Sequence, residues 1–100
     1  MKNLPYFITK SALIDLEEIW LYTVEKWSVI QADRYYSLII DEINYICKNP
    51  TAGKSINDIR KEYRASKVKS HLIFYRIQPA AIEIVRILHE RMDIDNRLED

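Results

Sequence analysis

The sequence predicts an α+β domain in which an antiparallel helical hairpin packs on a four-stranded, mainly antiparallel sheet. Two long stretches in the first half of the chain have apolar residues every three or four positions, which is typical of amphipathic helices. The second half has short β-branched and aromatic runs separated by turn residues. The predicted order is strand, helix, helix, strand, strand, strand, over residues 4–9, 10–27, 28–49, 60–65, 70–77 and 81–88.

The first strand and the first helix are predicted from residues 4–27. The run LPYFIT is short, aromatic and β-branched, and Pro5 lies where a missing backbone N–H is tolerated at a sheet edge. Thr9 or Ser11 can cap the helix that follows. The apolar stripe of this helix is Ala12, Leu16, Ile19, Trp20, Thr23 and Trp27, and the side chains expected on its solvent-facing side are Asp15, Glu18 and Glu25.

The second helix is predicted to begin after Ser28 and to end before Pro50. Ser28 and Gln31 form a capping-box pattern, and the residue before a proline is pushed out of helical geometry. The short connection between the two helices predicts an antiparallel hairpin. Cys47 continues the apolar stripe, so we expect a buried small side chain and not a reactive thiol. The stripe is Ala32, Tyr35, Ile39, Ile43, Ile46 and Cys47.

The strands of the second half follow a loop over residues 49–58. Residues 60–65 alternate with a period of two, and residues 70–77 and 81–88 form a hairpin through Gln78–Ala81. If Ile77 faces Ile82, then Arg76 faces Glu83, Phe74 faces Val85 and Leu72 faces Ile87. We assign this mostly apolar side to the helical hairpin, although a shift of one residue would exchange the two sides. The other side is expected to be partly open to a partner and carries His71, Ile73, Tyr75, Ile84, Arg86 and Leu88.

Length and composition limit the classes of protein that the chain can be. One hundred residues suit a single domain over residues 1–100, and 15 basic side chains balance 15 acidic ones, so no general attraction to nucleic acid is expected. A single cysteine excludes an internal disulfide and suits a reducing cytoplasm. We find no signal peptide, membrane span, P-loop, dinucleotide fingerprint or cluster of metal ligands, so neither a metal nor a cofactor is expected.

Several motifs together resemble a known family. The most specific are SHLIFYR, residues 70–76, and RILHERMD, residues 86–93. With the predicted order of elements, they resemble the RelE/ParE superfamily of toxins from bacterial toxin–antitoxin systems over nearly the whole chain, and the ParE branch most closely. Further residues that carry the resemblance are Ala12, Asp15, Leu16, Ile19, Trp20, Tyr22, Ala32, Tyr35, Asn49, Pro50, Gly53, Ile59, Arg60, Tyr63 and Arg64.

The resemblance implies a toxin that acts by binding and not by catalysis. Members of the ParE branch poison DNA gyrase, with its A subunit as the expected contact, by trapping the enzyme with its DNA cut. A ParD-like antitoxin neutralises such a toxin by laying its C-terminal segment over it, so a hetero-oligomer is expected. DNA would be contacted only through gyrase or the antitoxin, in the cytoplasm and without a membrane.

Six residues are candidate contacts for these partners. Arg86 projects from the side of the sheet expected to be open, with an ion pair to Glu62 as the alternative. A basic group that includes Lys67 and Lys69 could meet an acidic antitoxin segment or DNA bound to gyrase, or could simply be solvated. The tail after residue 91 could form a short helix or fray. The candidates are Arg60, Arg64, Tyr75, Arg86, Arg91 and Met92.

Two alternative functions remain open from the sequence. The RelE branch cuts messenger RNA on the ribosome, and the candidate residues for such chemistry are Arg64, Arg86, His89 and Arg91. Balanced charge and the lack of a terminal tyrosine beside a basic residue argue against it, and we expect His89 to point toward the helices as a hydrogen-bonded end of its strand. The second alternative is an inactive toxin-like protein that only binds the antitoxin.

Overall fold

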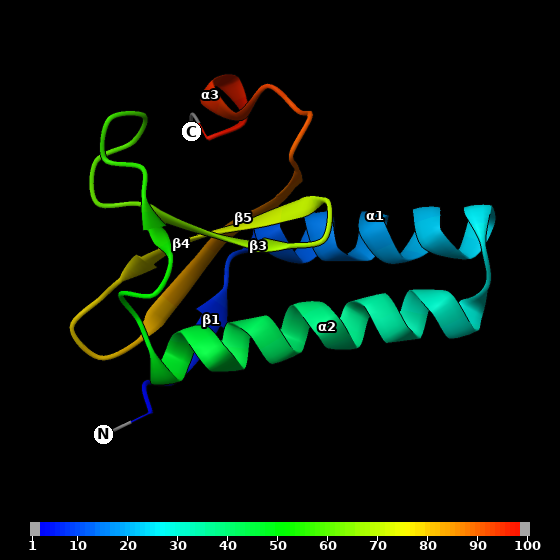
Figure 1. Cartoon of the computed structure of the whole chain (residues 1–100), viewed down its shortest axis with the longest axis horizontal. Helices are drawn as coiled ribbons and strands as arrows, with labels where there is room; N and C mark the ends of the chain where they lie inside the picture. The colour runs from blue at the N-terminus through cyan, green and yellow to red at the C-terminus, as the bar shows by residue number, and fades with distance from the viewer. Residues whose placement is uncertain (1–2, 99–100) are drawn as a thin grey trace.

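The structure is a computed structural model that describes residues 3–98 and consists of a five-stranded sheet with two long helices on one face (Figure 1). The strand order is β1-β5-β4-β3-β2, with β1 parallel to β5 and the other pairs antiparallel. The elements are β1 (Tyr6–Ile8), α1 (Lys10–Lys26), α2 (Val29–Lys48), β2 (Lys54–Ser55), β3 (Arg64–Val68), β4 (His71–Ile77), β5 (Ile82–His89) and α3 (Ile94–Arg97). The predicted α+β class and helical hairpin are confirmed.

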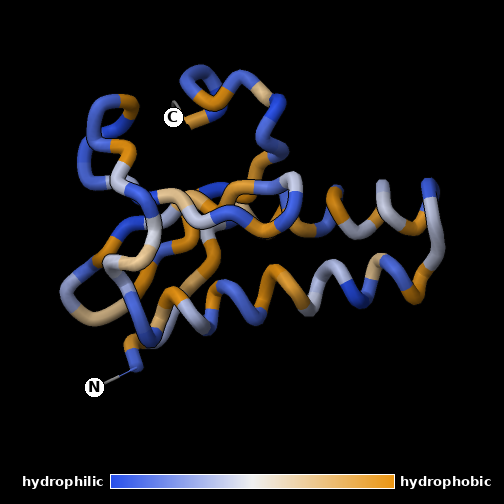
Figure 2. The backbone as a smooth tube through the Cα atoms, viewed as in Figure 1, coloured by the Kyte–Doolittle hydropathy of each residue, from blue (hydrophilic) through white to orange (hydrophobic). Residues whose placement is uncertain are grey.

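The helices begin where the capping residues predict. The Thr9 hydroxyl accepts a hydrogen bond from the Ala12 N–H, and the Ser28 hydroxyl accepts one from the Gln31 N–H. The stripe predicted for α2 is buried apart from Tyr35, which is partly exposed, and Cys47 is buried within it. Figure 2 shows the apolar positions that recur along both helices. The periodicity of 3.6 residues therefore identified the face of α2 that packs on the sheet.

Two predictions for α1 were wrong. Asp15, expected on the solvent side, is only 8% exposed, and Trp27, expected to pack in the hairpin, is 75% exposed. Asp15 is buried because it forms an ion pair with a strand. Trp27 is exposed because the far end of the hairpin projects beyond the sheet (Figure 1), where no strand lies beneath it.

The second strand lies later in the chain than predicted, and the sheet has five strands where four were predicted. β3 begins at Arg64, while residues 60–62 form a turn that ends at Glu62 with a left-handed φ of 68°. This backbone geometry interrupts a strand. The additional strand β2 contributes only Lys54 and Ser55, which pair with the start of β3.

A β-bulge changes the register of the central hairpin. Ile77 pairs with Ile82 and Arg76 with Glu83, as predicted, but Phe74 pairs with Arg86 because Val85 has no partner of its own. Leu72 consequently pairs with Leu88 and not with Ile87. The extra residue turns Arg86 and Leu88 away from the helices, and it brings Ile87 and His89 to the helical side.

The main core lies between the helices and the sheet. The face assignment was wrong for Ile73, Tyr75 and Ile84, which face the helices instead of solvent. The bulge keeps the helical face apolar along both halves of β5. The buried residues of this core are Ala12, Leu16, Ile39, Ile43, Ile46, Cys47, Val68, Ile73, Tyr75, Ile82, Ile84 and Ile87.

A second, smaller core covers the opposite face of the sheet. Phe74 and Leu72, which we assigned to the helical side, lie here, and the chain itself covers the face that was expected to be open. The loop between β2 and β3 supplies Ile56 and Tyr63, and the C-terminal segment supplies Leu98. Up to Leu98 the tail contains the short helix α3, and Leu98, which is 3% exposed, packs on the sheet. Residues 99 and 100 of the tail lie outside the described residues.

Candidate functional site

An open groove of about 800 Å³ separates the projecting part of the helical hairpin from the end of the sheet. α1 and the start of α2 form one wall, and the turn between β3 and β4, the end of β5 and the residues after it form the other. The lining residues are Asp15, Glu18, Ile19, Tyr22, Thr23, Trp27, Gln31, Tyr35, Lys69, Ser70, His71, Ile87, His89, Arg91 and Met92. The lining combines apolar and aromatic side chains with charged ones, a composition that suits an amphipathic segment.

Two histidines meet in the groove. His71 and His89 are directly opposite each other on β4 and β5, with ring centroids 5.2 Å apart in an edge-to-face arrangement. The Tyr35 hydroxyl lies 2.7 Å from His71 Nδ1, and His89 Nδ1 accepts a hydrogen bond from the Arg91 N–H at 3.1 Å. His89 therefore lies on the helical side with a hydrogen bond, as predicted. The sequence did not identify His71 as its neighbour, because the bulge was not anticipated.

His71 lies in a setting that disfavours positive charge. Burial and the adjacent His89 lower the pKa of His71 from 6.5 to about 4, and Glu90 opposes this effect. Burial also raises the pKa of the Tyr35 hydroxyl. At neutral pH both His71 and Tyr35 are therefore uncharged hydrogen-bonding groups.

His71 should make the fold less stable in mild acid. The unfolded chain binds a proton at this imidazole near pH 6.5 and the folded chain only near pH 4, so stability falls as the pH is lowered through this window. We expect the loss to be on the order of 1 to 2 kcal/mol, after allowing for solvent screening of a partly exposed ring. Urea unfolding of the parent and of His71→Asn between pH 7 and pH 4 measures it, since the variant lacks this contribution. Identical pH dependence in the two proteins would contradict it.

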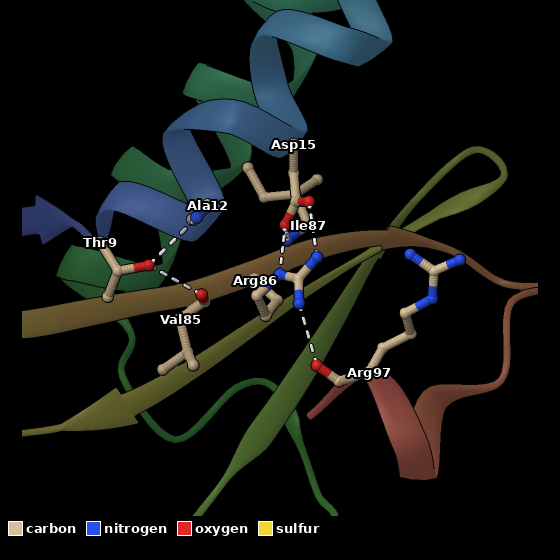
Figure 3. A network of polar contacts seen from close by, with 7 residues as sticks. All are labelled: Thr9, Ala12, Asp15, Val85, Arg86, Ile87 and Arg97. Atoms are coloured by element: carbon tan, nitrogen blue, oxygen red, sulfur yellow. Dashed lines mark hydrogen bonds and ion pairs between the residues drawn. The ribbon is translucent and has the colours of Figure 1, made fainter. Parts of the chain in front are cut away.

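Arg86 joins three parts of the fold at the edge of the groove (Figure 3). Its Nε and Nη2 donate to Asp15 at 2.7 and 2.8 Å, and its Nη1 donates to the Arg97 carbonyl at 2.9 Å. The Asp15 carboxylate also accepts the Ile87 N–H at 3.0 Å, beyond the point where pairing between β1 and β5 ends. Arg86 is paired with Asp15 and not with Glu62, so its guanidinium is engaged in holding the fold.

Arg64 and Tyr75 stabilise the loop after α2. Tyr75 is completely buried, and its hydroxyl donates to the Pro50 carbonyl at 2.7 Å and accepts the Gly53 N–H at 2.9 Å. A Cβ at Gly53 would collide with that hydroxyl and with the buried ring of Tyr75, so only glycine fits here. Arg64 donates to the carbonyls of Thr51 and Gly53. The expectation that Tyr75 contacts a partner is corrected, because its side chain has no exposed surface.

The groove gathers two of the six candidate partner contacts, Arg91 and Met92. Arg60 lies in the turn before β3, and Arg64 and Arg86 bind backbone carbonyls elsewhere. Of the four residues considered for RNA cleavage, His89 and Arg91 line the groove, whereas Arg64 lies at the loop after α2. The structure therefore does not bring this set of four together.

Sequence reasoning missed the aromatic wall of the groove. Tyr22 and Trp27 are 61% and 75% exposed and line it from α1 and from the connection to α2. A signal was present, since Leu21 and Tyr22 lie outside the stripe that α1 needs for packing on the sheet. Apolar side chains on more than one side of a surface helix indicate a second contact.

Two further features of the described residues bear on function. No helix within residues 3–98 is long and apolar enough to cross a bilayer. The same residues contain no group of three or more histidine, cysteine, aspartate or glutamate side chains that could hold a metal ion.

Comparison with known proteins gives concordant results. The relatives include "Toxin ParE1" of Mycobacterium tuberculosis, 38% identical over 94 residues, which are 93% of this chain and 96% of the relative. "Toxin ParE1" of Caulobacter vibrioides is 35% identical over 89 residues, which are 89% and 92% of the two chains. A solved structure entitled "Chromosomal ParDE TA system from P. aeruginosa" has the same fold, with a TM-score of 0.77, 17% identity and coverage of 87% of this chain and 96% of that one. The family model described as "ParE toxin of type II toxin-antitoxin system, parDE" matches residues 6–94. The chain belongs to the ParE toxin family of type II toxin–antitoxin systems.

Proposed function

We propose that the chain inhibits DNA gyrase by binding it and trapping the complex in which DNA is cut, and that a ParD-like antitoxin neutralises the chain by filling the groove. Gyrase, through its A subunit, and the antitoxin are protein partners, so DNA is met only through them. The toxin and antitoxin form a hetero-oligomer, and the setting is the cytoplasm, where gyrase works.

The exposed apolar groove is the observation that carries this proposal. Trp27, Tyr22 and Met92 are 75%, 61% and 40% exposed and line one continuous surface. Burying a large apolar side chain contributes about 1.5 to 3 kcal/mol, and aromatic side chains are the most frequent anchors of protein interfaces. A partner helix laid along this groove would gain such contributions from several side chains at once.

The arrangement of polar groups supports binding rather than catalysis. Metal-free RNA cleavage needs a base, an acid and cations that converge on one phosphate. Arg64 and Arg86 are held by backbone carbonyls and by Asp15 instead of facing the histidine pair. His71 Nδ1 is already hydrogen-bonded to Tyr35.

The second candidate function, ribosome-dependent RNA cleavage, is favoured by the pairing of His71 with His89 beside Arg91. One set of assays separates the candidates. Purified chain added to gyrase should block supercoiling and accumulate cut DNA, and the antitoxin should reverse both effects. Shortened transcripts from ribosomes, lost on His71→Ala or His89→Ala, would instead support the nuclease. If the chain neither blocks gyrase nor cuts transcripts but still binds the antitoxin, the result would support an inactive toxin-like protein.

Trp27→Ala is expected to weaken antitoxin binding by about 10-fold or more while leaving the fold intact, because the indole is exposed in the free protein and an antitoxin helix in the groove would bury it. Titration calorimetry with the purified antitoxin measures this change. Ile14→Ala is the matched control, since Ile14 is 47% exposed on α1 but does not line the groove. Equal affinities of the parent and Trp27→Ala would remove the indole from the interface.

A further inference from the structure

We infer that the sheet end of the groove is a carboxylate subsite, in which Lys69 and Arg91 bind an acidic side chain of an amphipathic helix and set the direction in which that helix lies. This inference rests on the proposed function, because the occupant is a segment of the antitoxin. It adds the chemistry that the segment must carry and the end of the groove where the acidic side chain must lie.

Two cations reach this end of the groove from separate segments. Lys69 lies in the turn between β3 and β4, with a left-handed φ of 55°, and Arg91 follows β5. The two segments are tied together, because the Glu90 N–H donates to the Ser70 carbonyl at 2.8 Å. His71 below adds a polar group whose lowered pKa keeps it uncharged at neutral pH. The cations are therefore presented on a connected backbone at one place.

Both cations are available to a partner. Lys69 and Arg91 are exposed, and within residues 3–98 neither lies within salt-bridge distance of a carboxylate. The nearby acid, Glu90, is paired with Lys67 at 3.0 Å. Pairing of Lys67 with Glu90 neutralises the main negative charge at this end and leaves a net positive surface.

The rest of the groove is mostly apolar with an exposed negative charge, and this composition selects the class of ligand. Ile19, Tyr22 and Trp27 make the α1 wall apolar, and Glu18 adds an exposed negative charge on the same wall. A nucleic acid would place phosphates against Glu18 and unpaired polar groups on the apolar surface, which costs free energy. A helix with an acidic side chain at one end, apolar side chains along one face and a basic side chain toward α1 would match the groove. Its acidic side chain would meet Lys69 and Arg91, its apolar face the α1 wall, and its basic side chain Glu18.

Charge complementarity of this kind fixes orientation more than it adds affinity. A helix laid in the reverse direction would bring its acidic side chain to Glu18 and its basic one to Lys69 and Arg91. Like charges would then meet at both places, and the apolar contacts alone would not distinguish the two directions. Reversing the charge of the two cations should therefore disturb binding more than their exposure suggests.

The test uses full-length toxin and the purified product of the reading frame adjacent to its gene. Affinity is measured by calorimetry for the parent, for Lys69→Glu/Arg91→Glu and for Lys54→Glu, an exposed control on β2 outside the groove. We expect the double variant to bind about 30-fold or more weakly and the control to bind like the parent. Acidic residues of the partner are then replaced singly by lysine, and one replacement should restore binding to the double variant.

The outcomes distinguish the inference from the proposed function. A parent that does not bind the partner overturns the proposed function itself. A parent and a double variant that bind equally overturn the carboxylate subsite and leave the proposed function standing. Equal weakening by Lys54→Glu, or a single-stranded oligonucleotide that binds the parent and not the double variant, also overturns it. If the double variant has a lower melting temperature than the parent, Lys69→Gln/Arg91→Gln replaces it and should also bind the partner more weakly than the parent.

Discussion

Replacing Asp15 by alanine is expected to lower the free energy of unfolding by about 3 to 5 kcal/mol. The carboxylate is 8% exposed and accepts hydrogen bonds from Arg86 Nε, Arg86 Nη2 and the Ile87 N–H. Its removal leaves a partly buried guanidinium without a counter-charge and an N–H at the sheet edge without an acceptor, and both cost free energy. Urea unfolding at pH 7 measures the loss.

Matched variants test whether the loss of these hydrogen bonds and of the ion pair causes the lower stability of Asp15→Ala. Asp15→Asn keeps an acceptor for the Ile87 N–H but removes the charge, so it should lose less than Asp15→Ala. The double variant Asp15→Ala/Arg86→Ala should be less destabilised than the sum of the single changes, because each single change leaves the other group unpaired. Additive losses would show that the two side chains contribute independently.

The same network changes what is expected of Arg86. From the sequence, Arg86 was expected to project from the open side of the sheet as a contact for a partner. Arg86 instead joins α1, β5 and the segment that carries α3. Loss of its guanidinium should reduce stability first, so a loss of toxicity on Arg86→Ala does not by itself place this residue in an interface.

The helices show what local patterns predict well. The stripe of α2 and the caps of both helices depend on residues within a few positions of each other, and the structure confirms them. Asp15 was misplaced because a charged residue on a helix is normally solvated. Its partner, Arg86, is 71 positions away in the sequence, and a local pattern cannot predict a contact over that separation.

The register of the β4–β5 hairpin shows a different limit. Alternation of apolar and polar residues predicted the strands and the pairs nearest the turn, but one unpaired residue, Val85, shifted every pair beyond it by one position. A bulge has no strong sequence signature when the extra residue is β-branched and suits a strand. The face of β4 was assigned wrongly for another reason, because both of its sides are apolar: Phe74 and Leu72 face the smaller core, and Ile73 and Tyr75 face the helices.

The candidate site was predicted only where it is continuous in sequence. His89, Arg91 and Met92 lie within one motif and do line the groove. Lys69, His71 and Trp27 join them through the overhang of the hairpin and the pairing of β4 with β5, which are properties of the assembled fold. Conversely, Arg64 and Tyr75 were nominated by residue type, and their neighbours show that they stabilise a loop.

Phe74→Ala is expected to cost about 3 to 5 kcal/mol, and to lower the melting temperature by on the order of 12 °C or more. The ring is 1% exposed and lies in the smaller core with Tyr63, Leu88 and Leu98. Truncation leaves a cavity under the loop before β3 and the C-terminal segment, and a small core has few other side chains that could fill it. Differential scanning calorimetry measures the loss.

The amides that lose protection in Phe74→Ala test on which side of the sheet the Phe74 ring packs. Because Phe74 faces away from the helices, its truncation should speed hydrogen exchange first in the turn at Ile59 to Tyr63 and in α3. Amides within α1 and α2 should lose protection only through the lower global stability. Phe74→Leu, which keeps most of the volume, should cost no more than about 1.5 kcal/mol and leave the local exchange pattern unchanged. Early loss of protection in the helices, or a melting temperature within a degree or two of the parent, would contradict a core held between the sheet and the C-terminal segment.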